Sequence, residues 1–300
     1  MTELIVRRPT LDDIEAVVEL GNAFERVFLG AESFTAGEVA DQWRQLDLDE
    51  DAWLVVVPGG RLAGFATLEH RGEGRFQSDG YVHPELRGLG AGGKLVDLAE
   101  DRARARGGAY VHNTIVGHDE AAVDLLTTRG YRAVRYFYRM AVELGDEAPE
   151  PGWPEGVRAE PFREDDALAF HEAIEDAWKD AWDHTPRPFE VFRDRVMGSL
   201  YEPSLWTVVW SEDEIAGGTV CEAEYYGMGW VRALFVRRQW RRRGLGMALL
   251  LNAFRQFHER GERRVGLGVD AESPTGATRL YERAGMKVAE ELAIYRKELS

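Results

Sequence analysis

The chain has very little cysteine, no long apolar run and no excess of positive charge. Cys221 is the only cysteine among 300 residues, and a single thiol forms neither an internal disulfide nor a structural zinc site. This scarcity is typical of a reducing compartment, so we expect a cytoplasmic location. No stretch approaches the roughly 20 apolar residues of a transmembrane helix. The opening residues also lack the apolar core of a signal peptide.

The formal net charge of −16 argues against partners that are themselves anionic. An acidic surface repels phosphate backbones and anionic lipids, so we expect neither a nucleic-acid partner nor a membrane partner. The charge is compatible with a cationic substrate, and no prediction of oligomeric state follows from it. Hydrophobic residues make up 44% of the chain, which is the composition of an ordinary globular protein. No cluster of metal ligands is visible along the sequence, and we expect no metal.

The sequence repeats itself once. Arg87 and Arg241 occupy equivalent places in the two copies and are 154 residues apart. Since there are only two copies, each as large as a domain, the pattern indicates a duplicated domain and not a solenoid. We expect a first domain over residues 1–145, a linker rich in proline, glycine and acid over 146–156, and a second domain over 157–300.

Each copy carries a glycine-rich loop between a strand-like stretch and an amphipathic helix. Glycines at such a turn let backbone N–H groups approach an anion, and the helix N-terminus adds unpaired donors and partial positive charge. Neither loop is a Walker A motif or a dinucleotide-binding fingerprint. A helix entry that needs glycine only for its turn is the alternative, but two such loops in matching positions favour phosphate binding. The residues are Val82, Arg87, Gly88, Gly90 and Gly92 in the first copy, and Arg241, Arg242, Arg243, Gly244, Leu245 and Gly246 in the second.

The spacing Arg-x-x-Gly-x-Gly, which begins at Arg87 and again at Arg241, resembles the coenzyme-A-binding motif of the GNAT acetyltransferases. The resemblance covers nearly the whole chain, twice. It implies two tandem α/β folds, each a mixed, mostly antiparallel sheet flanked by helices, and it implies acetyl-CoA as the cofactor. By the same resemblance, the amides from Arg242 to Gly246 hold the pyrophosphate. The backbone at Phe235 and Val236 would face the acetyl carbonyl and the pantetheine.

The end of the second copy is similar to the second motif of this family, in which Leu-Tyr-Glu precedes a glycine turn. The resemblance implies that Tyr281 faces the sulfur of the coenzyme and acts as the acid; a purely packing aromatic is the alternative. Ser273 lies near the place where many relatives have asparagine, and it is a candidate contact of the pantetheine. The first copy has Leu126 in place of the tyrosine, so we expect it to be catalytically silent, with a structural or coenzyme-binding role. The tandem layout resembles that of mycothiol synthase, but no acceptor is assigned from it.

The reaction also needs a base, because an alkylammonium with a pKa near 10.4 must lose its proton. Glu222 and Glu224 are the candidates, and their spacing would place both on one face of a regular strand. Two solvated surface acids or a water relay are the alternatives. In this family the first two helices shape the acceptor pocket, here about residues 171–200, where tryptophans alternate with acids. This pattern fits an amine site or the solvated face of an amphipathic helix.

Together, these features predict an N-acetyltransferase that moves an acetyl group from acetyl-CoA to a primary amine of a small molecule by direct attack on the thioester. Two alternatives stay open: acetylation of a protein or peptide, and an acyl-CoA-binding sensor without turnover. Tyr281 in the second copy favours the enzyme over the sensor. An enclosed acidic pocket would favour a small amine over a peptide.

Overall fold

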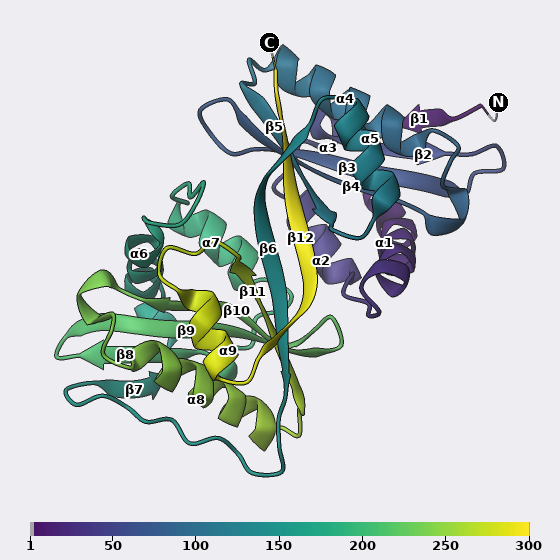
Figure 1. The fold of residues 1–300 in the computed structure, drawn as a ribbon. Helices are drawn as coiled ribbons and strands as arrows, with labels where there is room; N and C mark the ends of the chain where they lie inside the picture. Colours follow the sequence, from purple (N-terminus) through teal and green to yellow (C-terminus); the bar gives the residue numbers. More distant parts are fainter. Residues whose placement is uncertain (1–2, 300) are drawn as a thin grey trace. The chain divides into compact units, whose positions relative to one another are not determined.

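The computed structural model describes residues 3–299, which form two compact units. The first unit contains the chain up to Phe137 together with the C-terminal segment from Glu290, and the second contains Tyr138–Ala289. Each unit has a mostly antiparallel sheet with helices on both faces, which confirms the predicted fold class (Figure 1). None of the helices in the described range is long and apolar enough to cross a membrane.

The sheet of the first unit has the strand order β1-β2-β3-β4-β5-β12. All neighbouring strands in it are antiparallel except β4 and β5, which are parallel. Its strands are β1 (Ile5–Arg7), β2 (Ala52–Val56), β3 (Leu62–His70), β4 (Arg75–Val82), β5 (Tyr110–Val116) and β12 (Lys287–Glu298). Its helices are α1 (Ile14–Phe28), α2 (Ala36–Trp43), α3 (Leu48–Asp51), α4 (Ala91–Ala105) and α5 (Glu120–Thr128), with short 3-10 turns η1 (Leu11–Asp13) and η2 (Pro84–Leu86).

The second unit repeats this plan, with the strand order β6-β11-β10-β9-β8-β7 and one parallel pair, β10 with β11. Its strands are β6 (Arg132–Glu143), β7 (Arg158–Pro161), β8 (Thr207–Ser211), β9 (Glu214–Tyr225), β10 (Met228–Val236) and β11 (Arg264–Asp270). Its helices are α6 (Ala167–Trp178), α7 (Phe189–Val196), α8 (Leu245–Glu259) and α9 (Ala277–Arg283), with 3-10 turns η3 (Glu164–Asp166), η4 (Pro203–Leu205) and η5 (Arg238–Trp240).

Strand β2 is apolar at every position because it is buried on both faces. In β2, Trp53 and Val55 pack in one cluster with residues of α4, whereas Leu54 and Val56 pack in another with residues of α1 and α2. Successive side chains of a strand point to opposite faces, so a strand between two helical layers needs apolar residues at every position. The β-branched stretches in the sequence therefore mark central strands.

The units differ from the expected domains at their ends. Residues Leu292–Glu298 of β12 pair antiparallel with Val116–Tyr110 of β5, so the last strand of the chain completes the sheet of the first unit. Lys297 supports this placement, because its Nζ donates to the buried carboxylate of Glu100 on α4 at 2.7 Å. Conversely, β6 begins in the first unit, and its second half, from Tyr138, belongs to the second. Each repeat therefore exchanges its final strand.

The expected linker forms no helix or strand between Glu143 and Arg158, but it belongs to the second unit. The Leu144 N–H donates to the carbonyl of Arg263 at 2.6 Å, and Trp153 packs against the cluster around Trp240. These contacts hold the segment on the surface of the second unit.

Candidate active site

Two parallel strands of the second unit separate along their length. The last partners in their register are Val231 and Leu267, yet β10 continues to Val236 and β11 to Asp270. Between Val231 and Ala233, β10 also has a bulge relative to β9, which adds one unmatched residue, Arg232. The backbone of β10 beyond the bulge therefore borders a gap in the sheet. In the first unit, β4 and β5 diverge in the same way beyond Ser78 and Asn113.

A cavity of about 740 Å³ lies at this gap in the second unit. Its walls come from the second half of β10, the loop from Arg237 to Gly244, the end of β11 and helix α9. We call this loop the phosphate loop. Of the residues that the sequence singled out, the cavity is lined by Phe235, Val236, Arg241, Arg242, Gly244, Gly246, Ser273 and Tyr281. Arg243, Leu245, Glu222 and Glu224 are not among its lining residues.

The phosphate loop presents free amide groups at the start of α8. Within residues 3–299, the N–H groups of Arg242, Arg243 and Gly244 donate no hydrogen bond to another backbone group. Gly244 is the N-cap, with φ of +87°, and Arg242 has φ of +65°, which is uncommon for a residue with a side chain. Positive φ turns successive amides toward one side, and the partial positive charge of a 15-residue helix adds to them. The loop is thus built to hold an anion.

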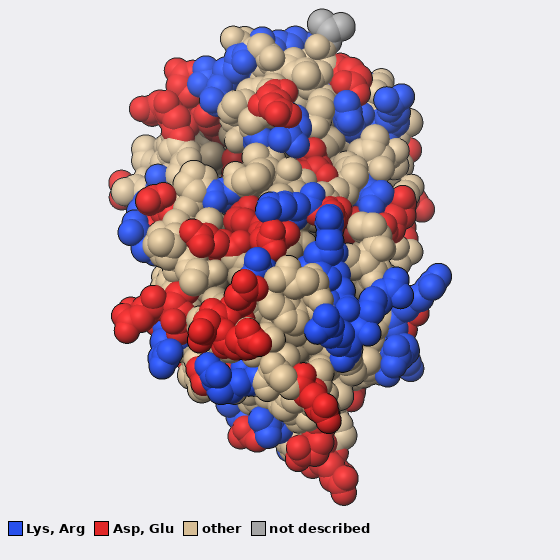
Figure 2. All heavy atoms as spheres, turned by 90° about the vertical axis from the view of Figure 1, so that its left-hand side faces the viewer, with Lys and Arg blue, Asp and Glu red and all other residues tan. Residues whose placement is uncertain are grey.

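Four arginines at this loop and on α9 strengthen the attraction for an anion. They form no ion pair or side-chain hydrogen bond within the described residues 3–299, and three of them line the cavity. A local group of basic side chains is compatible with the acidic total, because charges of each sign gather in patches on the face shown in Figure 2. The four are Arg242, Arg243, Arg279 and Arg283.

Tyr281 lies on α9 with only 7% of its surface exposed, and it lines the cavity. Burial raises the pKa of its phenol to about 12, because the anionic form would lose its hydration. The hydroxyl is therefore protonated at neutral pH and available as a donor. Helix α9 packs closely against the start of α8. A Cβ added at Gly246 would lie only 3.1 Å from the side chain of Leu280. Gly246 is needed for this close approach of the two helices.

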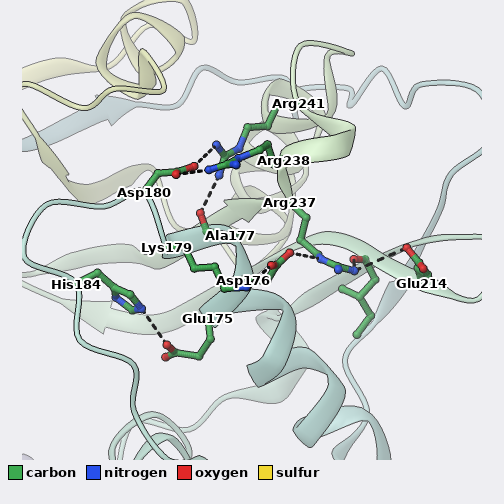
Figure 3. A network of polar contacts seen from close by, with 11 residues as sticks. Glu175, Asp176, Ala177, Lys179, Asp180, His184, Glu214, Arg237, Arg238 and Arg241 are labelled. Atoms are coloured by element: carbon green, nitrogen blue, oxygen red, sulfur yellow. Dashed lines mark hydrogen bonds and ion pairs between the residues drawn. The ribbon is translucent and has the colours of Figure 1, made fainter.

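Arg241 uses its side chain to anchor the phosphate loop. Its Nε donates to the carbonyl of Val236 at 3.0 Å. Its Nη2 donates to the carbonyl of Ala177 at 2.7 Å and its Nη1 to Asp180 at 3.0 Å (Figure 3). The guanidinium is thus occupied by three protein acceptors. The resemblance places Arg241 in a cofactor-binding motif. In the structure, its side chain binds other parts of the protein and stabilises the loop.

The two candidate bases lie in different environments. Glu222 is buried on β9, and burial raises the pKa of its carboxyl although Arg232 opposes the shift. Arg232 donates to one carboxylate oxygen, while the other, Oε2, is buried and has no hydrogen-bond partner among residues 3–299. Arg232 itself lines the cavity. Glu224 is exposed to solvent. Of these two candidates, Glu222 is therefore the one connected to the cavity, through Arg232.

The acidic segment near α6 is mostly paired. Glu175 Oε2 lies 2.9 Å from His184 Nε2, Asp176 accepts from Arg237 at 2.8 Å, and Asp180 accepts from Arg238 and Arg241 (Figure 3). Only the stretch from Ala177 to Ala181 lines the cavity, and Trp178 is its aromatic member. Sequence reasoning placed the acceptor region here but did not single out Asp180. The only signal for that residue is its place two residues after the end of α6.

The corresponding residues of the first unit give a different picture. Gly88 and Gly90 have positive φ of +78° and +94°, so the turn is preserved. Val82 and Leu126 belong to the apolar cluster beside α4. Arg87 binds Asp119 through two hydrogen bonds of 2.8 and 2.6 Å. The backbone of the motif is repeated, whereas its side chains have other partners.

Comparison with known proteins agrees with this geometry. The family described as acetyltransferase (GNAT) matches residues 17–131 and again residues 167–286. The chain belongs to the GNAT acetyltransferase family. It is an acyltransferase with two tandem GNAT folds, and the two matched regions are the two copies that the sequence predicts.

Relatives with curated names are mycothiol acetyltransferases. That of Catenulispora acidiphila is 28% identical over 298 residues, covering 94% of each chain. That of Thermobispora bispora is 32% identical over 250 residues, covering 78% of this chain and 79% of the relative. The tandem layout is thus shared with these enzymes, as the sequence indicated.

Solved structures show the same architecture over the full length. A GCN5-related N-acetyltransferase from Sphaerobacter thermophilus is 36% identical, with a TM-score of 0.80, covering 99% of this chain and 96% of that one. A tandem GNAT protein from the clavulanic acid biosynthesis pathway has a TM-score of 0.76 at 16% identity, covering 99% of both chains. At that identity, the second structure supports the fold alone.

Proposed function

We propose that the chain transfers an acetyl group from acetyl-CoA to a primary amine of a small molecule, and that the second unit carries out the chemistry. The observation that carries this proposal is the arrangement of Tyr281. Its buried hydroxyl lines a cavity that also opens onto free amides and unpaired arginines. Such a cavity suits a ligand with an anionic end and a reactive end.

The residues at the cavity fit the chemistry of coenzyme A. The amides of Arg242, Arg243 and Gly244 would hold the pyrophosphate, because a helix N-terminus with unpaired donors favours phosphate. Arg279 and Arg283 would bind further phosphate oxygens, since guanidinium pairs well with them. When bound, acetyl-CoA supplies an acyl group activated as a thioester.

The side chains and backbone near the reacting end then have separate roles. Phe235 and Val236 provide strand backbone beside the gap, where an N–H aimed at the acyl oxygen would stabilise negative charge as it develops. The Tyr281 hydroxyl would donate a hydrogen bond to the coenzyme's sulfur and stabilise it as a leaving group. Ser273 also lines the cavity, and its Oγ lies 3.0 Å from the hydroxyl of Thr275.

We assign Glu222 as the base, acting through water because it does not itself line the cavity. Removing a proton from an alkylammonium costs about 4–5 kcal/mol at pH 7. A carboxyl whose pKa is raised by burial is better matched to that task than the exposed Glu224. The buried, unpartnered Oε2 has a free site for the proton, and Arg232 connects Glu222 to the cavity wall.

The first unit would be catalytically silent. Leu126 is buried at the place of Tyr281 and offers no proton. This division assigns binding and chemistry to residues 138–289 and a supporting role to the first unit. Relatives that are named for mycothiol, a small molecule, favour a small acceptor over a protein.

A screen of primary amines with acetyl-CoA, read as released coenzyme A thiol, tests the proposal. We expect at least one small amine to give turnover that depends on Tyr281. Coenzyme binding without turnover on any amine, but with turnover on peptides, would favour the protein acetyltransferase. Binding without turnover on either class would favour the sensor.

A further inference from the structure

Asp180 is one of two acidic residues, with Asp270, that line a cavity rich in arginine. It follows α6 and lines the cavity, with 34% of its side chain exposed. A carboxylate beside a phosphate-binding loop repels phosphate, so on charge alone the residue opposes the proposed ligand. Its partners indicate another role. Asp180 accepts hydrogen bonds from both Arg238 and Arg241, one at each end of the turn that leads into the phosphate loop (Figure 3).

The contacts of Arg241 draw this turn toward α6. Besides Asp180, the guanidinium binds the carbonyl of Ala177, in the last turn of α6, and that of Val236, at the end of β10. A planar guanidinium with several acceptors is held in one orientation. Arg241 therefore points toward α6, whereas the segment before α9 forms another part of the cavity wall.

The first unit shows what happens when Asp180 is replaced. The first helices of the two units, α1 and α6, begin 153 residues apart, at Ile14 and Ala167, and by that spacing Val27 stands in the place of Asp180. Its apolar side chain offers no acceptor to an arginine.

Arg87, which also lies against α1, has its carboxylate partner on a different segment of the first unit. Its Nη1 and Nη2 donate to both carboxylate oxygens of Asp119, at 2.8 and 2.6 Å, and its guanidinium lies 4.3 Å from the ring centroid of Phe28. Asp119 is the N-cap of α5 and is 2% exposed. The salt bridge therefore joins the glycine-rich loop to the segment before α5. In the second unit the corresponding two segments both form parts of the cavity wall.

We propose that Asp180 is a positioning residue for the cofactor, which holds Arg241 against α6 and so keeps the cleft of the second unit open. In the first unit Val27 takes its place, and Arg87 closes the cleft by binding Asp119. The chain therefore binds one coenzyme A, in the second unit. This inference rests on the proposed function, because it concerns the same cavity.

Titration calorimetry with coenzyme A tests the inference through the sign of one effect. Asp180→Asn removes a negative charge near the phosphate loop, so simple repulsion predicts tighter binding. The positioning role predicts weaker binding by about fivefold, the value of one partly exposed ion pair. Asp180→Glu keeps the charge and should retain most of the affinity. Glu172→Gln makes the same charge change on an exposed position of α6 and should leave binding unchanged.

Kinetics separate positioning from a general loss of structure. Asp180→Asn should raise KM for acetyl-CoA and leave kcat within about twofold, because the residue acts on the loop and not on the reacting atoms. Equal or tighter binding by Asp180→Asn would overturn the role of Asp180, and two coenzymes per wild-type chain would overturn the closure of the first unit. A wild-type chain that binds no coenzyme A would instead refute the proposed function itself.

Discussion

Replacing Tyr281 by phenylalanine removes one hydroxyl from the cavity and leaves the ring in place. The side chain is 7% exposed and packs in the core of the second unit, so the phenyl ring of the variant fills the same space. Coenzyme affinity should therefore persist, while turnover should fall. The change separates the chemical role of the residue from its packing role.

The size of the fall follows from the pKa of the phenol. Burial raises that pKa to about 12, whereas a cysteine-like thiol has a pKa near 8.5. Complete proton transfer from Tyr281 to a thiolate would thus be uphill by about 5 kcal/mol, so the hydroxyl acts as a hydrogen-bond donor to the developing charge. A hydrogen bond to a charged group contributes about 1.5–3 kcal/mol. We therefore expect Tyr281→Phe to lower kcat by about 10- to 150-fold.

Stopped-flow or steady-state release of thiol, with calorimetry for coenzyme A, measures both effects.

The dependence of stability on alkaline pH provides a second test of the buried phenol. Because the folded pKa of Tyr281 lies above its unfolded value near 10, its contribution to stability is fully present below pH 10 and is lost as the pH rises toward 12. Between pH 9 and 11, wild type should lose about 1 kcal/mol more unfolding free energy than Tyr281→Phe. An unchanged kcat on a confirmed acceptor would show that Tyr281 only packs.

Two further predictions concern other parts of the chain. Glu222→Gln should lower kcat/KM about tenfold or more near neutral pH, with the deficit shrinking as the pH approaches the pKa of the amine, because free amine then no longer needs a base; a pH–rate profile parallel to that of wild type would contradict the assignment. Ending the chain after Ala289 should expose the edge of β5, because Leu292–Glu298 pair with it. Hydrogen exchange should then show lost protection in Tyr110–Val116, whereas protection retained there would contradict the strand exchange.

The repeat, the fold class and the glycine-rich loops were predictable because they depend on local patterns. Both strand faces of β2 are apolar, and both loops place glycines at positive φ before a helix. The exchange of the last strands was not predictable in this way. The final strands of the two repeats occupy equivalent places, and nothing local in β12 distinguishes a partner in its own repeat from β5.

The sequence also could not predict which partners the side chains bind. Arg87 and Arg241 occupy the same motif position, yet one binds Asp119 and the other binds Asp180. The difference depends on a segment about 60 residues away in the chain, where Val27 and Asp180 correspond. Glu222 and Glu224 are equivalent in spacing, and only the fold shows that one is buried beside Arg232 and the other is exposed.

Paired replacement of the two N-cap glycines tests most directly the claim that the second unit carries the chemistry. Gly90 and Gly244 have φ of +94° and +87°, so valine strains both backbones alike, by about 1–3 kcal/mol. Gly261→Val, at the other end of α8 with φ of +88°, controls for that strain outside the cavity. We predict that Gly244→Val abolishes acetyl transfer from acetyl-CoA, while Gly90→Val and Gly261→Val keep most of it. A Gly90→Val protein that melts like the Gly261→Val control and has no activity would contradict the account.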